Sequence, residues 1–132
     1  MSKIFEFDPV VYPTRIWVSV NPSAEDLQKK FDFLDDNDQI IDNVDLNDYF
    51  NAIATTFSVK DRNSLWKGCC VCLWRPKQIG VGVIAHESGH CTDWLCDELD
   101  IGGFSFKDGE ARQYYTQWEA NSIFSVLKKK NK

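Results

Sequence analysis

Two histidines stand four residues apart in the segment His86-Glu87-Ser88-Gly89-His90, which has the form H-E-x-x-H. Residues i and i+4 of an α-helix lie on one face, one turn apart, so both imidazoles can converge on one cation at about 2.0–2.1 Å. Glu87 flanks that face, where it could reach a water molecule at the metal without being a ligand itself. The chain holds only these two histidines. Their spacing predicts a zinc site.

The third ligand is not fixed by the motif. A zinc ion with three protein ligands keeps its fourth position for water. Glu110 begins a predicted helix, and a helix hairpin of this length could bring its first turn back to the metal. Asp93 lies three residues after His90 on the same face, where a carboxylate more often accepts a hydrogen bond from a ligand imidazole. We therefore favour Glu110 as the third ligand and expect Asp93 to accept a hydrogen bond from a ligand imidazole. We discount Cys91 and Cys96, which point off the histidine face.

The first 35 residues predict two strands and one helix. Residues 3–7 and 14–20 are expected to be strands, the second because its side chains alternate with a period of two. Residues 21–35 are expected to form an amphipathic helix that starts at an Asn-Pro-Ser segment. The apolar residues of that helix at positions i, i+4 and i+7 are Leu27, Phe31 and Leu34.

An acidic segment follows over residues 35–48, and a calcium-binding loop has to be considered for it. An EF-hand loop needs glycine at its sixth position and glutamate at its twelfth. Counted from Asp36, these positions hold Ile41 and Asn47. The pattern fails, and we expect a solvated acidic loop.

The rest of the chain predicts a hairpin and two helices. Residues 52–60 and 64–75 are rich in strand formers on either side of a turn, and the second arm is apolar enough to be buried on both faces. Residues 77–99 carry apolar residues at helical spacing around the H-E-x-x-H segment, and residues 110–129 repeat that spacing. The order predicts an α+β fold with a small sheet that carries helices.

Composition limits the classes of partner. The chain has 132 residues, of which 43% are hydrophobic, and a formal net charge of −5. This length and apolar content predict one domain over residues 1–132. The acidic balance and the lack of a long apolar run predict no nucleic-acid partner, no membrane contact and a cytoplasmic location. Five cysteines, three of them crowded at positions 69–72, are expected to be reduced thiols packed as small apolar side chains.

Gly89 stands inside the predicted helix, where glycine costs about 0.5–1 kcal/mol relative to alanine. A close backbone neighbour, such as a strand passing over the metal, would explain it, and tight helix packing would explain it equally well.

From His86 onward the chain resembles the small zincin-like metallopeptidases encoded by phages and prophages. Their pattern is H-E-x-x-H with an aspartate three residues later, then an acidic Glu-Ala segment and a tyrosine that opens the final helix. The matching residues here are Asp93, Glu110-Ala111 and Tyr114. The family tends to have Ala and Gly along the last helix, where this chain has Gln113, Gln117 and Glu119.

The resemblance implies a zincin-like fold, a small mixed sheet packed on helices with the H-E-x-x-H helix at its centre. It also implies His86, His90 and Glu110 as zinc ligands, with Glu87 as the catalytic base. The expected function is a zinc-dependent hydrolase, a peptidase acting on a peptide or protein substrate in a bacterial host cell. Tyr114, one turn after Glu110, is the best donor for the oxyanion, although a tyrosine packed in the core is an equal alternative.

Two further classes of function stay open. One is a metal-binding or interaction module without catalysis, in which the site serves stability. The other is a small regulator whose helix face binds a partner.

Overall fold

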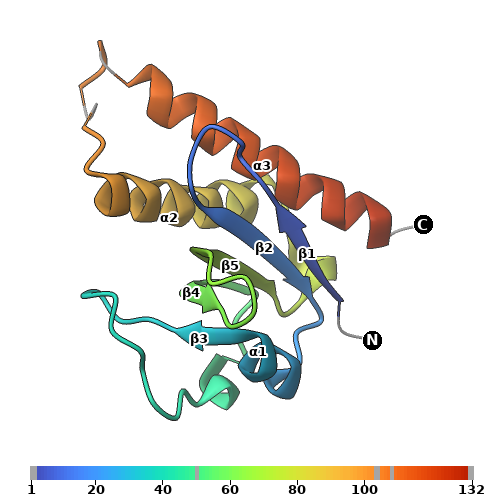
Figure 1. Cartoon of the computed structure of the whole chain (residues 1–132). Helices are drawn as coiled ribbons and strands as arrows, with labels where there is room; N and C mark the ends of the chain where they lie inside the picture. Colours follow the sequence, from blue (N-terminus) through green and yellow to red (C-terminus); the bar gives the residue numbers. More distant parts are fainter. Residues whose placement is uncertain (1–2, 50, 103–104, 108, 131–132) are drawn as a thin grey trace. The chain divides into compact units, whose positions relative to one another are not determined.

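We describe a computed structural model of the chain over residues 3–49, 51–102, 105–107 and 109–130 (Figure 1). Contacts divide the chain into two compact units, residues 1–79 and residues 80–132. Each unit is described by itself below. The first holds a five-stranded sheet and a short helix, and the second holds two long helices, so the expected α+β class is confirmed. The expectation of one domain over residues 1–132 stays a prediction.

The sheet of the first unit is mixed, with the strand order β1-β2-β5-β4-β3 (Figure 1). Its strands are β1 (Lys3–Phe7), β2 (Arg15–Val20), β3 (Phe31–Phe33), β4 (Ala54–Asp61) and β5 (Lys67–Leu73). The β2–β5 pair is parallel, and the other three pairs are antiparallel. Strands β1, β2 and the β4–β5 hairpin therefore form where the sequence predicts them.

Strand β5 occupies the middle of the sheet, and six of its seven residues are buried. This confirms the prediction of a strand covered on both faces. Gly68 opens this buried run because the strands approach closely there. A Cβ atom at Gly68 would stand 1.7 Å from the backbone oxygen of Arg15, its partner on β2.

The helix predicted for residues 21–35 is too long. Helix α1 spans Ala24–Lys30, begins with a Ser23 cap that accepts from the Asp26 N–H, and ends where Phe31 turns extended. Residues Phe31–Phe33 then form β3, with Phe31 opposite Asp61 on β4. Phe31 and Phe33 are both buried, which a strand achieves through its period of two.

One apolar cluster lies within the first unit and includes residues of α1, β2, β3, β4 and β5. Most of the acidic segment is solvated as predicted, but residues Leu46–Tyr49 form a 3₁₀ turn that buries Leu46. All five cysteines are buried and none forms a disulfide, which confirms the prediction of reduced thiols packed in the interior. The buried members of the cluster are Trp17, Leu27, Phe31, Phe33, Leu46, Val59, Cys70 and Cys72.

The second unit consists of α2 (Val81–Leu99) and α3 (Glu110–Lys130). The last helix starts where it was predicted, but α2 starts four residues later than predicted. Pro76–Gln78 form a separate 3₁₀ turn, and Gly80 is extended and serves as the N-cap of α2. The helix ends at Asp100, whose left-handed backbone (φ 52°) lets its N–H bond to the Cys96 carbonyl. From the sequence we also predict that Gly102-Gly103 breaks this helix, but Gly103 lies outside the described residues.

Helices α2 and α3 lie side by side and run in opposite directions (Figure 1). Two polar contacts fix their register. The hydroxyls of Thr92 and Thr116 are 2.5 Å apart, and Arg112 Nη2 donates to Asp93 Oδ1 at 3.1 Å. None of the helices in the described part of the chain is both long and apolar enough to cross a membrane.

Candidate metal site

His86 and His90 form an exposed pair on one turn of α2. Their Nε2 atoms are 3.1 Å apart and their rings are nearly perpendicular, at 85°. The side chain of His86 is 67% exposed. Two nitrogens bound to one tetrahedral zinc ion at the usual distance stand about 3.3 Å apart. The pair is therefore already spaced to fill two positions around such an ion.

Glu87 stands beside this pair but is anchored in the protein. Its side chain is 7% exposed, and its Oε2 lies 3.9 Å from His86 Nε2. The two imidazoles face solvent while this carboxylate sits at the buried edge of the same turn, because successive residues of a helix are 100° apart. A carboxylate held in this way is next to the site without occupying the outward positions of the histidines.

Gly89 has no close neighbour. A Cβ atom there would meet nothing within 4 Å outside its own helix turn. Among the described residues of the second unit, the explanation by tight helix packing is therefore wrong, and the explanation by a strand passing over the metal stays a prediction. What the half-buried glycine does provide is open space beside the histidine turn of α2.

Glu110 and Tyr114 lie apart from the histidine pair. The contact between Thr92 and Thr116 marks one level along the two antiparallel helices. Glu110 lies six residues before Thr116 on α3, and His90 lies two residues before Thr92 on α2, so they stand on opposite sides of that level. At 1.5 Å per residue, Glu110 and His90 are roughly 12 Å apart along the helix axis. Tyr114 is two residues before Thr116, about 160° around the helix from the side that contacts α2. Its side chain is largely exposed, as is Glu110.

Asp93, three residues after His90, is a predicted site residue whose side chain pairs with a residue of α3. Its side chain is 66% exposed and forms an ion pair with Arg112 of α3. The same contact with Asp93 raises the pKa of Arg112 above its ordinary value. Asp93 thus links α2 to α3 through the Arg112 guanidinium, whereas the support expected of it was a hydrogen bond to a ligand imidazole, which stays a prediction.

The zinc expectation can be judged on this geometry. The histidine spacing fits the ion, and Glu87 is close by. Within the described ranges, however, no group of three or more His, Cys, Asp or Glu side chains converges as a complete ligand set. The structure therefore brings together His86, His90 and Glu87, and it does not bring Glu110 to them.

Glu119 is a buried acid that was not among the predicted site residues. Its side chain is 0% exposed on α3, and neither carboxyl oxygen has a partner at full hydrogen-bond geometry among the described residues. Burial raises its pKa to about 8, although the nearby Tyr115 hydroxyl and Cys91 thiol act in the opposite direction. The sequence could have indicated this burial, because Glu119 falls at helical spacing among residues that face the protein interior. Those residues are Tyr115, Ile123 and Val126.

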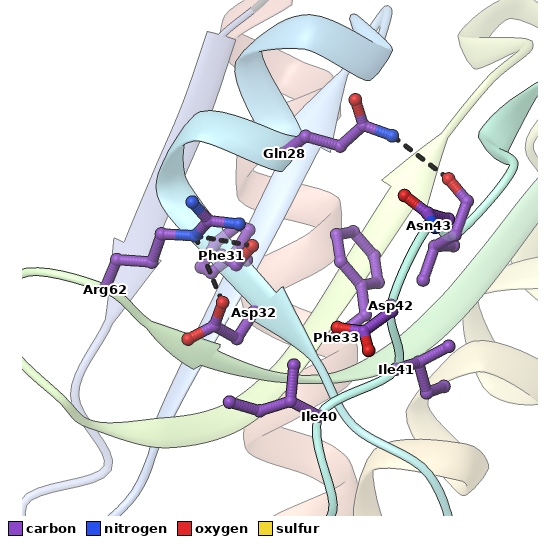
Figure 2. Close-up of a pocket in the computed structure, with 10 residues that line it drawn as sticks. Gln28, Phe31, Asp32, Phe33, Ile40, Ile41, Asp42, Asn43 and Arg62 are labelled. Atoms are coloured by element: carbon purple, nitrogen blue, oxygen red, sulfur yellow. Dashed lines mark hydrogen bonds and ion pairs between the residues drawn. The ribbon is translucent and has the colours of Figure 1, made fainter.

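The first unit carries a separate hollow, lined by α1, β3 and residues 40–44 (Figure 2). Its volume is about 510 Å³. Arg62 crosses its wall, where it pairs with Asp32 at 3.2 Å and donates to the Phe31 carbonyl (Figure 2). Gln28 closes another side by donating to the Val44 carbonyl. These groups bond to one another, and none of the predicted site residues lines this hollow.

Comparison of the chain with models of protein families, with curated proteins and with solved structures found no match. The reading of the site accordingly depends on the residues and their geometry.

Proposed function

We propose that the chain is a zinc-dependent hydrolase, and more narrowly a peptidase of zincin-like fold that acts on a peptide or protein substrate in the cytoplasm of a bacterial host cell. The observation that carries the proposal is the exposed histidine pair, with Nε2 atoms 3.1 Å apart and a buried glutamate beside it. This arrangement follows from the H-E-x-x-H spacing and needs no other element of the chain.

His86 and His90 would hold the ion through their Nε2 atoms, and Glu110 would supply the third ligand, with Asp93 as the alternative. A zinc ion in such a site makes a water molecule acidic near neutral pH and polarises a carbonyl group. Glu87 would take the proton from the attacking water and deliver it to the leaving amine, which is the work of a general base that becomes a general acid. Because the Glu87 side chain is buried, its carboxylate would keep one orientation during both proton transfers. Tyr114 would donate to the oxyanion.

For Glu110 and Tyr114 to act at the metal, the start of α3 has to move toward His90. Glu110 is the first residue of α3, so such a movement would displace the first turns of that helix. Arg112 and Asp93 would separate in the process, which frees the Asp93 carboxylate to accept from an imidazole.

Glu87→Gln tests the hydrolase proposal against a metal-binding module without catalysis. The zinc-loaded protein is incubated with a mixture of peptides, and new termini are identified by mass spectrometry. We expect Glu87→Gln to lose at least about 100-fold in rate while it keeps its zinc. Asp97→Asn, an exposed carboxylate on the same helix, is the matched control and should cleave at the rate of the parent. Equal cleavage by Glu87→Gln, or none by the parent, would refute the proposal.

The third ligand is tested by metal content at dilute protein concentration. Glu110→Ala should lose zinc in a competition with a chelator that Asp93→Ala survives. The reverse result would assign the ligand to Asp93.

A further inference from the structure

The histidine pair offers half of a tetrahedral site on an open surface. Two Nε2 atoms fit two positions of one ion, and no third His, Cys, Asp or Glu converges on them among the described residues. Zinc fills four positions, so two remain for other donors. On the exposed surface of α2, water or side chains of another molecule could occupy those two positions.

We propose that a second copy of this chain supplies them, so that one zinc ion joins two copies through His86 and His90 of each. Four imidazoles make a complete zinc ligand set. The partner thus contributes half of the site, and the dimer needs no apolar interface beyond it. The inference adds a regulatory state to the proposed hydrolase, and its regulatory part rests on that proposed function.

The surface around the pair can accept such a partner. In each copy, the line joining the two Nε2 atoms runs along α2. The two histidines of one copy and the ion define one plane, the histidines of the other copy define a second, and tetrahedral coordination sets these planes at right angles. The two copies of α2 would therefore cross at about 90° and meet only at the histidine turn. Gly89 lies at that crossing, and both it and Gly82 have open space where a side chain would be.

Charge around the pair is compatible with this arrangement. Asp93 and Asp97 are exposed and lie three and seven residues beyond His90, about 5 and 10 Å along the helix. In a perpendicular crossing these carboxylates do not meet their counterparts, so they do not oppose the pairing of two copies. Glu87 stays buried at the edge of the turn in each copy.

The dimer would hold the hydrolase silent. Four histidines fill every position around the ion, so neither water nor a substrate carbonyl can enter. Excess zinc, or dilution, returns each copy to a separate ion with open positions. Such pairing would restrain the proposed peptidase in a way that depends on its own concentration.

The experiment is a zinc titration of the full chain, followed by light scattering after size exclusion, with thiols kept reduced. The expected mass rises from 15.2 kDa to about 30 kDa, is highest at half a zinc ion per chain, and falls again when zinc is in excess or is chelated. His86→Ala and His90→Ala should each stay at the lower mass. Glu110→Gln should still form the dimer, because its carboxylate has no part in it.

Three outcomes would overturn the inference. A monomer that binds one zinc ion tightly would refute the dimer and leave the hydrolase proposal standing. A dimer that persists in chelator or in His86→Ala would show a different interface. A chain that takes up no zinc would refute the dimer and the hydrolase together.

Discussion

Replacing the buried Glu119 with glutamine should change how the stability of the fold depends on pH. Burial raises the pKa of Glu119 to about 8, against an ordinary value of 4.5. The folded chain therefore keeps a proton on this carboxyl that the unfolded chain releases. Between these two values the free energy of unfolding falls as pH rises, because the unfolded state gains from ionisation that the folded state resists.

The size of the effect follows from the difference between the pKa of Glu119 in the folded chain and its ordinary value. Each pH unit in that window costs about 1.4 kcal/mol, so the loss at pH 7 is about 3 kcal/mol and levels off above pH 8 at about 5 kcal/mol. Glu119→Gln keeps the shape of the neutral carboxyl and cannot ionise. At pH 5 the variant should match the parent, and at pH 7 it should be more stable by up to about 3 kcal/mol.

Urea unfolding followed by circular dichroism measures this difference at half-unit steps from pH 5 to pH 8.5. Chelator and reductant are present throughout, because bound metal would add its own stabilisation. Glu110→Gln is the matched control on the same helix. It removes an exposed carboxylate at a helix start, so it should lower stability by at most about 1 kcal/mol with no slope between pH 6 and 8. Parallel curves for Glu119→Gln and the parent would refute the buried neutral carboxyl.

Three further changes have defined outcomes. Gly68→Ala places a Cβ against the Arg15 backbone and should lower the free energy of unfolding by more than about 3 kcal/mol, measured by urea titration, whereas a loss below 1 kcal/mol would show that β2 and β5 can separate there. Asp61→Asn should cost about 2 kcal/mol at pH 7, because the ion pair with Lys30 at 2.7 Å is lost. Burial opposes the shift, but Lys30 and two backbone N–H groups lower the pKa of Asp61. The stabilisation from the Asp61 carboxylate is therefore present above about pH 4 and fades as pH falls. Thermal melts should show the difference in stability between Asp61→Asn and the parent closing below about pH 4. Arg112→Met should release Asp93 and lower stability by less than about 1 kcal/mol, since Asp93 is mostly exposed, and a loss above 2 kcal/mol in the same melts would contradict a weak pair.

The sheet was predictable where pattern and pairing agree locally. Residues 14–20 alternate with a period of two, and residues 52–75 hold two strand-forming arms around one turn, so β2, β4 and β5 form near their expected positions. Phe31–Phe33 could not be found in this way. Phe31 fits both the helical spacing from Leu27 and the strand spacing to Phe33, and pairing with a strand thirty residues away decides between them.

The candidate site, like the sheet, was predictable only where local geometry determines it. His86, Glu87 and His90 lie on one helix turn, so their relation follows from helix geometry alone and the structure has them as expected. The position of Glu110 depends on the register between α2 and α3. That register is set by contacts such as Thr92 with Thr116, which no local pattern reveals.

Zinc affinity in His86→Ala tests the central claim most directly. Competition with a chromophoric chelator gives the dissociation constant of the parent, the alanine variant and Glu87→Gln. We predict that the parent binds zinc with a dissociation constant below about 1 μM, that His86→Ala binds at least about 100-fold more weakly, and that Glu87→Gln stays within about tenfold of the parent. Zinc binding by the parent that is no tighter than in His86→Ala would contradict the assignment of the histidine pair as a metal site.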